Sequence, residues 1–167
     1  MKINLSQIRQ SPGTSCSYEL AEQLSPVELP GEILTFQGPV KAKLTAVNTG
    51  RLIHIQGELQ AQVELKCGRC LDPYFHQAEV SFDENYCHAA ETQDAEVGEE
   101  FKVFEGDILD ITSEVVESII VGLPMKPVCQ VNCQGLCPHC GQDLKAAKCL
   151  CQEDKVDPRL EILKKLL

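Results

Sequence analysis

The fold is decided by one stretch of the sequence, Ile53-His-Ile-Gln-Gly-Glu-Leu-Gln-Ala-Gln-Val-Glu-Leu-Lys-Cys67. Its odd positions carry apolar or small residues, and its even positions carry polar or charged ones. Because successive side chains of a β-strand point to opposite faces, this alternation predicts a long strand with one buried and one solvated face. Residues 67–73 predict a turn, and Tyr74 to about Tyr86 predicts the antiparallel partner, whose inward residues should be Ala78, Val80 and Phe82.

Other strands are expected on both sides of this pair. The pattern becomes β-like from Ile33, and Val40–Val47 predicts a strand that ends at the turn sequence Asn48-Thr-Gly50. Phe101–Phe104 predicts a short strand. Residues 1–30 are less informative, although three apolar residues can begin a strand or a short helix: Ile3, Leu5 and Ile8.

Two helices are expected later in the chain. The first covers about residues 110–122, with Asp110 as N-cap and a broad apolar stripe of Ile111, Val115, Val116, Ile119 and Ile120. Gly122 and Pro124 end it. The second covers 157–167, with Asp157 as N-cap, Pro158 at the first helical position, and one apolar face of Leu160, Leu163 and Leu167.

Strands that precede helices indicate an α+β fold. We therefore predict an antiparallel β-sheet body with two C-terminal helices flanking a cysteine-rich zinc-knuckle lobe. The body covers residues 1–125 and includes an acidic loop at about 83–106. The metal lobe covers residues 126–156 and precedes the C-terminal helix at 157–167.

Six cysteines lie within 23 residues, in Cys129-Gln-Val-Asn-Cys133-Gln-Gly-Leu-Cys137-Pro-His-Cys140-Gly141 and Cys149-Leu-Cys151. A two-residue gap, as in Cys137-x₂-Cys140, lets a tight turn direct both sulfur atoms to one metal ion. A structural Zn²⁺ takes four such ligands in a closed tetrahedron. We expect one zinc ion per chain, and the alternative is disulfides or scattered buried thiols.

The ligand set stays open at this point. Cys137 and Cys140 form the firm pair, and the other two ligands come from Cys149 and Cys151 or from Cys129 and Cys133. Three lysines near this segment can offset part of the negative charge of four thiolates, namely Lys126, Lys145 and Lys148. Because the segment has few apolar residues, its folding should be coupled to metal binding.

Cys67 and Cys70 admit three interpretations. Cys67 continues the inward alternation of the long strand, which favours a role in the core or the turn. The two cysteines can instead share a metal site, if the C-terminal lobe folds back to supply a second pair. A redox pair is the third interpretation, although the strand-to-helix context of thioredoxin-like motifs is missing.

The negative charge is concentrated in one window. Twelve acids and one base, Lys102, lie between Asp83 and Glu117, so the net charge of this window is −11. The formal net charge of the whole chain is −10, so the other residues together carry +1. Residues 87–100 lack any periodicity and predict a mobile loop. An acidic chain is poorly suited to broad binding of nucleic-acid backbone. The window suits a basic protein partner, or it serves solubility alone.

The sequence also indicates the cellular compartment of the protein and lacks the common catalytic motifs. The start of the chain has no apolar run long enough for a signal peptide, and no stretch approaches a membrane span. Ten cysteines without an export signal indicate the reducing cytoplasm. The sequence has no nucleotide-binding glycine loop, no Gly-x-Ser-x-Gly elbow and no His-Glu-x-x-His motif, so we expect no catalytic residue, no small-molecule substrate and no enzymatic activity.

Taken in order, these motifs resemble the YceD family, the "large ribosomal RNA subunit accumulation" proteins of bacteria and plastids. The resemblance covers about residues 35–167 and rests on Cys67-Gly-Arg-Cys70, the helix that closes in Gly122-Leu-Pro124, the six cysteines from Cys129 to Cys151, and Asp157-Pro-Arg159. It implies a non-enzymatic role in making the large ribosomal subunit.

We therefore expect a ribosome biogenesis factor that supports accumulation of large-subunit rRNA. The acidic window would receive a basic ribosomal protein, and the zinc lobe would contact the rRNA precursor together with Arg159, Lys164 and Lys165. A redox-sensing zinc chaperone is one alternative, because closely spaced thiolates release metal on oxidation. A transcription-linked interaction module is the other.

Overall fold

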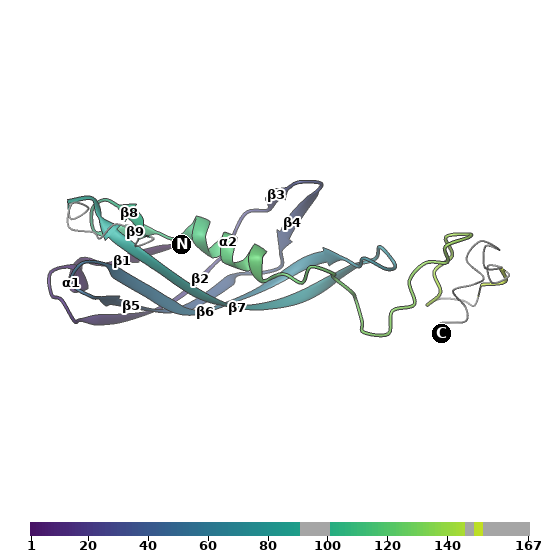
Figure 1. The fold of residues 1–167 in the computed structure, drawn as a ribbon, viewed down its shortest axis with the longest axis horizontal. Coiled ribbons are helices and arrows are strands. Elements are labelled where there is room, and N and C mark those ends of the chain that lie inside the picture. Colours follow the sequence, from purple (N-terminus) through teal and green to yellow (C-terminus); the bar gives the residue numbers. More distant parts are fainter. Residues whose placement is uncertain (91–100, 146–148, 152–167) are drawn as a thin grey trace, which may run out of the picture.

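The computed structural model describes residues 1–90, 101–145 and 149–151 (Figure 1). Residues 91–100 of the expected acidic loop, Lys148 and the expected helix at 157–167 lie outside these residues. The described part is mostly antiparallel sheet with few helices. The expected pair of helices around the cysteine lobe is therefore not confirmed. None of the helices in this part of the chain is long and apolar enough to cross a membrane.

One long hairpin dominates the sheet. Strands β6 (Ile53–Lys66) and β7 (Pro73–His88) pair antiparallel in unbroken register, from Ile53 opposite Tyr86 to Lys66 opposite Pro73. The alternation in the sequence predicts this hairpin correctly. Ile55, Leu59 and Val63 are fully buried, whereas Gln60 and Gln62 are exposed.

Four further strands pair with β6 or with its neighbours, and a fifth pairs with β7. Strands β5 and β4 pair antiparallel with β6, β2 pairs with β5, and β3 pairs with β4. Their bounds are Ser15–Glu22 for β2, Val27–Leu29 for β3, Glu32–Phe36 for β4 and Val40–Asn48 for β5. The short strand β8 (Lys102–Phe104) runs parallel to the end of β7.

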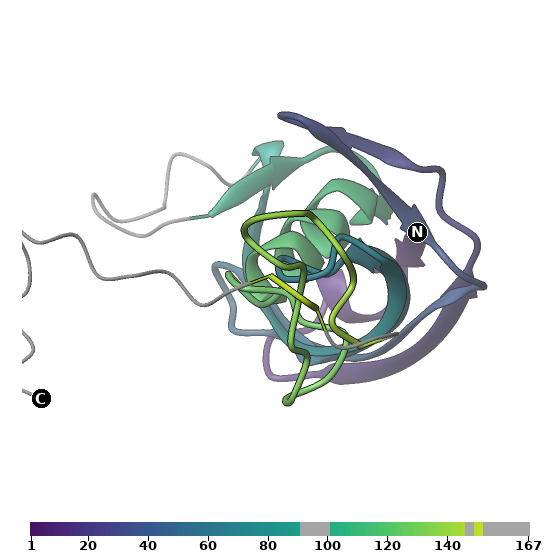
Figure 2. The ribbon, with the colours of Figure 1, turned by 90° about the vertical axis from the view of Figure 1, so that its right-hand side faces the viewer.

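Gly57 interrupts the apolar alternation of β6 for a steric reason. Strand β5 crosses so closely that a Cβ atom at this position would lie 2.0 Å from the backbone oxygen of Lys43. Only glycine allows this approach. Viewed along its length, the sheet curls around the helix that lies on its concave face (Figure 2).

That helix is α2 (Thr112–Gly122), which packs against β7 and β6. Val115 and Ile119 are buried in the same core as Phe82 and Tyr86. The expected N-cap needs correction, because Asp110 ends strand β9 (Ile108–Asp110) and Ile111 occupies the cap position. The carboxylate of Asp110 instead accepts hydrogen bonds from the hydroxyl and amide of Thr112 at 2.5 and 3.0 Å, which lower its pKa.

The N-terminal residues form both of the elements that the sequence allowed. Strand β1 (Lys2–Asn4) pairs with β9, and helix α1 (Ser6–Arg9) follows. Ile3, Leu5 and Ile8 are all buried. Strand β2 was not expected, although the sequence alternates between polar residues and Cys16, Tyr18 and Leu20. In the structure these three side chains are half-buried and pack against the core.

The predicted acidic loop at about 83–106 is wrong at both ends. Strand β7 continues to His88 because Tyr86 is buried in the core and because Tyr86, Cys87 and His88 pair with β8. The ring of His88 packs edge-on against Phe104, with ring centroids 5.3 Å apart. Asp83 and Glu84 therefore belong to a strand, and residues 91–100 lie outside the described structure.

The inward face of β6 generates a stability prediction. Val63→Asp places an unpaired charge at a side chain that is 0% exposed, so we expect a loss of several kcal/mol of unfolding free energy. Gln62→Asp, one position away on the solvated face, should be nearly neutral. Urea denaturation followed by circular dichroism measures both variants, and equal losses would show that the assigned faces are wrong.

Candidate metal centres

The turn between β6 and β7 is built to present two sulfur atoms. The amide of Cys67 donates to the backbone oxygen of Asp72 at 2.9 Å, and the amide of Leu71 donates to the backbone oxygen of Cys67 at 2.9 Å. Leu71 has a positive φ of 64°, which the turn requires to close. Cys67 and Cys70 are both buried within this turn.

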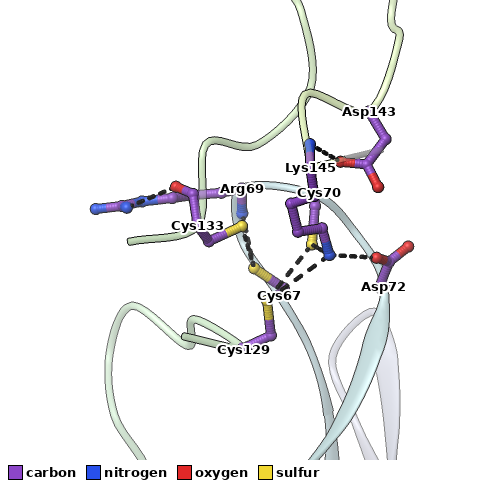
Figure 3. A network of polar contacts seen from close by, with 8 residues as sticks. All are labelled: Cys67, Arg69, Cys70, Asp72, Cys129, Cys133, Asp143 and Lys145. Carbon is purple, nitrogen blue, oxygen red and sulfur yellow. Dashed lines mark hydrogen bonds and ion pairs between the residues drawn. The ribbon is translucent and has the colours of Figure 1, made fainter. Parts of the chain in front are cut away.

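The segment that follows α2 returns to this turn and packs around it. The amide of Gly68 donates to the backbone oxygen of Pro127 at 2.8 Å. The guanidinium Nη1 of Arg69 donates to the backbone oxygens of Cys133 at 2.8 Å and Val131 at 3.2 Å. These bonds bring residues 127–136 against the hairpin (Figure 3).

The first result of this packing is an inner cluster of four cysteines. The sulfur atoms of Cys67, Cys70, Cys129 and Cys133 all lie within 4.8 Å of one another. Two of the separations, Cys67 to Cys133 and Cys70 to Cys129, are 3.8 Å. A tetrahedral site with Zn–S bonds of about 2.3 Å requires sulfur atoms about 3.8 Å apart, far longer than a disulfide bond of about 2.0 Å.

A second, outer cluster follows in the same segment. It contains Cys137, Cys140, Cys149 and Cys151, whose sulfur atoms again lie within 4.8 Å of one another. The knuckle turn closes through the amide of Gly141, which donates to the backbone oxygen of Cys137 at 2.9 Å. Gly141 has φ +74°, the conformation that favours glycine after such a turn.

The two clusters differ in exposure. In the inner cluster Cys67, Cys70 and Cys133 are buried, and Tyr74 and Val128 pack against them. In the outer cluster the equivalent shielding is missing for Cys140 and Cys151, which are exposed. All ten cysteines of the chain are free of disulfide bonds.

The electrostatics of both clusters favour a bound cation. The backbone amide of Cys70 stabilises the thiolate of Cys67, and the amide of Cys140 that of Cys137, so the pKa of each falls to about 6. Burial and the neighbouring thiols raise the pKa of Cys129 to about 12. One thiolate in each cluster is therefore favoured, and a divalent cation, if bound, would provide the charge that lets the others ionise.

Lys145 connects the two clusters. It lies in the outer segment, and its Nζ donates to Asp72 at 2.6 Å and to the sulfur of Cys70 at 3.0 Å in the inner cluster (Figure 3). A third, longer contact reaches Cys129 at 3.9 Å. The contacts with Asp72 and Cys70 raise the pKa of Lys145, so it stays positively charged beside the sulfur atoms.

The structure thus divides the predicted ligands differently from the single site expected. All six C-terminal cysteines join a cluster, but Cys129 and Cys133 pair with Cys67 and Cys70 instead of with Cys137 and Cys140. The single predicted metal site is thus replaced by two groups of four cysteines, each of which can hold a metal ion. The signal for the second group is in the sequence, because Cys67-x₂-Cys70 repeats the spacing of Cys137-x₂-Cys140.

Some relatives align with the whole length of this chain. An uncharacterized protein of Mycobacterium tuberculosis is 26% identical over 100% of this chain and 81% of its own. The uncharacterized protein YlbN of Bacillus subtilis is 26% identical over 100% of this chain and 96% of its own. No solved structure matches the chain.

One named relative and a family model identify the group. The large ribosomal RNA subunit accumulation protein YceD of Haemophilus influenzae is 29% identical over 53% of this chain and 55% of its own. The family model described as large ribosomal RNA subunit accumulation protein YceD matches residues 55–167, which include both cysteine clusters. This chain therefore belongs to the YceD family.

Proposed function

We propose that this protein is a non-enzymatic factor of ribosome biogenesis that supports the accumulation of large-subunit rRNA in the cytoplasm. It would act by binding a basic ribosomal protein or the precursor rRNA. The observation that carries this proposal is the family match over residues 55–167, whose description names the accumulation of large ribosomal subunit RNA. The named relative in Haemophilus influenzae has the same description.

The arrangement of the ionisable side chains supports a binding role over a catalytic one. His54 faces Asn85 on the solvated side of the sheet, with 3.0 Å between Nδ1 and Oδ1. His88 lies at the far end of β7, with its Nε2 3.3 Å from Nη1 of Arg9. Both of these histidines contact a partner on a neighbouring element, which is typical of structural histidines.

We assign Zn²⁺ to both cysteine clusters, because four thiolates in a closed tetrahedron are the usual ligands of structural zinc. The inner ion would be held by Cys67, Cys70, Cys129 and Cys133, and the outer ion by Cys137, Cys140, Cys149 and Cys151. Each ion would supply the folding free energy that the lobe cannot obtain from apolar packing. Four thiolates would complete the tetrahedron of each ion, as in structural zinc sites, and this supports a structural role.

A second candidate function, a redox-sensing zinc chaperone, is favoured by one observation. Cys140 and Cys151 are exposed, and exposed thiolates are oxidised most readily. Oxidation would release metal from the outer cluster first. In that case the protein would associate with unfolded clients after oxidation, and not with ribosomal precursors.

The metal assignment predicts two zinc ions per chain. Elemental analysis of protein prepared under reducing conditions should find about two equivalents of zinc. Cys140→Ser should remove about one equivalent and leave the sheet intact. Cys70→Ser should remove the other and also detach residues 127–136 from the hairpin, because the inner cluster joins the two segments.

Cys16→Ser is the matched control, because Cys16 lies on β2 away from both clusters, and its zinc content should equal that of the parent. Amide hydrogen exchange reports which segment loosens in each variant. A parent protein without zinc, or with disulfides within the clusters, would contradict the assignment.

The functional proposal predicts association with particles. An affinity-tagged chain should sediment with precursors of the large subunit in a sucrose gradient, and its depletion should lower large-subunit rRNA relative to small-subunit rRNA. Protein that remains in the free fractions, together with an unchanged rRNA ratio after depletion, would exclude this role.

A further inference from the structure

Strand β7 has a long edge with no strand partner in the described structure. One side of the strand pairs with β6 over residues 73–86, and the other side pairs with β8 only at Tyr86, Cys87 and His88. Residues 73–85 therefore present one set of backbone amides and oxygens that no described strand engages. Such an edge is a ready template for an additional strand.

A groove runs along part of this edge, between β7 and the C-terminal half of α2. It has a volume of about 550 Å³ and is lined by Glu79–Ser81, Asp83 and Glu84 from the strand and by Glu117, Ser118, Val121 and Gly122 from the helix. At Gly122 the helix lies against the strand so closely that a Cβ atom there would lie 2.1 Å from the side chain of Val80, so the helix can approach β7 here only with glycine at this position. The six positions from Glu79 to Glu84 span about 20 Å of strand.

The groove is strongly acidic. Four acidic residues border it: Glu84 and Glu117 lie on the side of α2, whereas Glu79 and Asp83 lie on the opposite, solvated face of β7, along the same free edge. The side chains of Asp83 and Glu117 are 69% and 68% exposed, and Asp83 lies 3.7 Å from Nδ1 of His54. A strand added to this edge would place side chains on both faces and so meet both pairs of carboxylates. The base at its margin is Lys102, which already contacts Glu84 at 3.4 Å and Glu117 at 3.7 Å and leaves an excess of negative charge.

One exposed apolar side chain completes the surface. Val121 is 85% exposed on the helical wall, although α2 otherwise buries its apolar residues against the sheet. A partner with Lys or Arg at most positions and a small apolar residue opposite Val121 would match both the charge and the apolar contact. Phosphate groups would be repelled by the same four carboxylates.

We propose that an extended, Lys/Arg-rich segment of a protein adds to the free edge of β7 as an extra strand and occupies the groove between β7 and α2. The backbone edge supplies the hydrogen bonds, and the carboxylates select a basic sequence. The chemistry of the groove stands by itself, but the identity of the partner as a ribosomal protein rests on the proposed function. The same negative charge disfavours nucleic acid as the occupant of this groove.

Binding of a short synthetic Lys/Arg-rich peptide to the full-length zinc-loaded protein tests the proposal. Fluorescence anisotropy measures the affinity, and amide hydrogen exchange locates the site. We expect slower exchange at residues 79–84 when peptide is bound, because a new strand protects the outward amides. The double variant Glu79→Lys with Glu117→Lys should weaken binding by about tenfold or more.

The double variant Glu19→Lys with Glu28→Lys is the matched control. It makes the same change in net charge at exposed positions of β2 and β3, so its affinity should stay near that of the parent. Equal weakening in both variants would show that only net charge matters and would overturn the proposal. Peptide binding without protection of residues 79–84 would also overturn it.

Two further measurements separate this inference from the proposed function. A single-stranded RNA oligonucleotide should give no protection at residues 79–84, and protection there would overturn the choice of a protein partner. If the parent binds the peptide in the groove but never sediments with ribosomal precursors, the proposed function fails and the groove assignment stands. If the groove variant sediments with precursors as the parent does, the assignment of a ribosomal protein to the groove fails and the proposed function stands.

Discussion

The antiparallel pairing of β6 with β7 is the constraint on which the rest of the structure depends. Its inward face carries the core around Val63 and Phe82, its turn carries two members of the inner cysteine cluster, and its free edge forms one wall of the acidic groove. A slip of one residue would exchange the buried and solvated faces. The same register that makes the core therefore positions both surfaces that we assign to function.

The two cysteine clusters close loops of very different length, and this sets the order in which they can form. Cys67 and Cys133 are 66 positions apart, whereas Cys137 and Cys149 are 12 apart. The entropy of loop closure grows with the length of the loop, so the outer cluster can assemble locally. The inner cluster requires the hairpin turn and the segment after α2 to meet, so it can form only after the sheet has folded and it then fixes the lobe to the sheet.

Local patterns in the sequence predict the elements but not the contacts between distant segments. The alternation in β6, the apolar stripe of α2 and the knuckle at Cys137 depend on neighbouring residues, and the structure contains each of them. The partition of the cysteines depends on a contact between residues 67–70 and 127–136, which no local pattern encodes. Strand β2 could have been predicted from the alternation of Cys16, Tyr18 and Leu20 with polar residues, whereas the extension of β7 could not, because it depends on pairing with β8.

Two of the cations beside the inner cluster are already engaged in holding it, Arg69 of the hairpin turn and Lys145 of the lobe. Arg69 donates to the backbone oxygens of Val131 and Cys133, and Lys145 contacts Asp72 and Cys70. A cation that neutralises thiolates and carboxylates within the protein contributes little to attracting phosphate groups. Lys126 is exposed, but one exposed lysine is a small electrostatic footprint for RNA. Any contact of the lobe with rRNA would therefore have to draw on basic residues beyond the described part, among them Arg159, Lys164 and Lys165. The described surface with the stronger charge signature is the acidic groove, whose charge suits a basic protein partner.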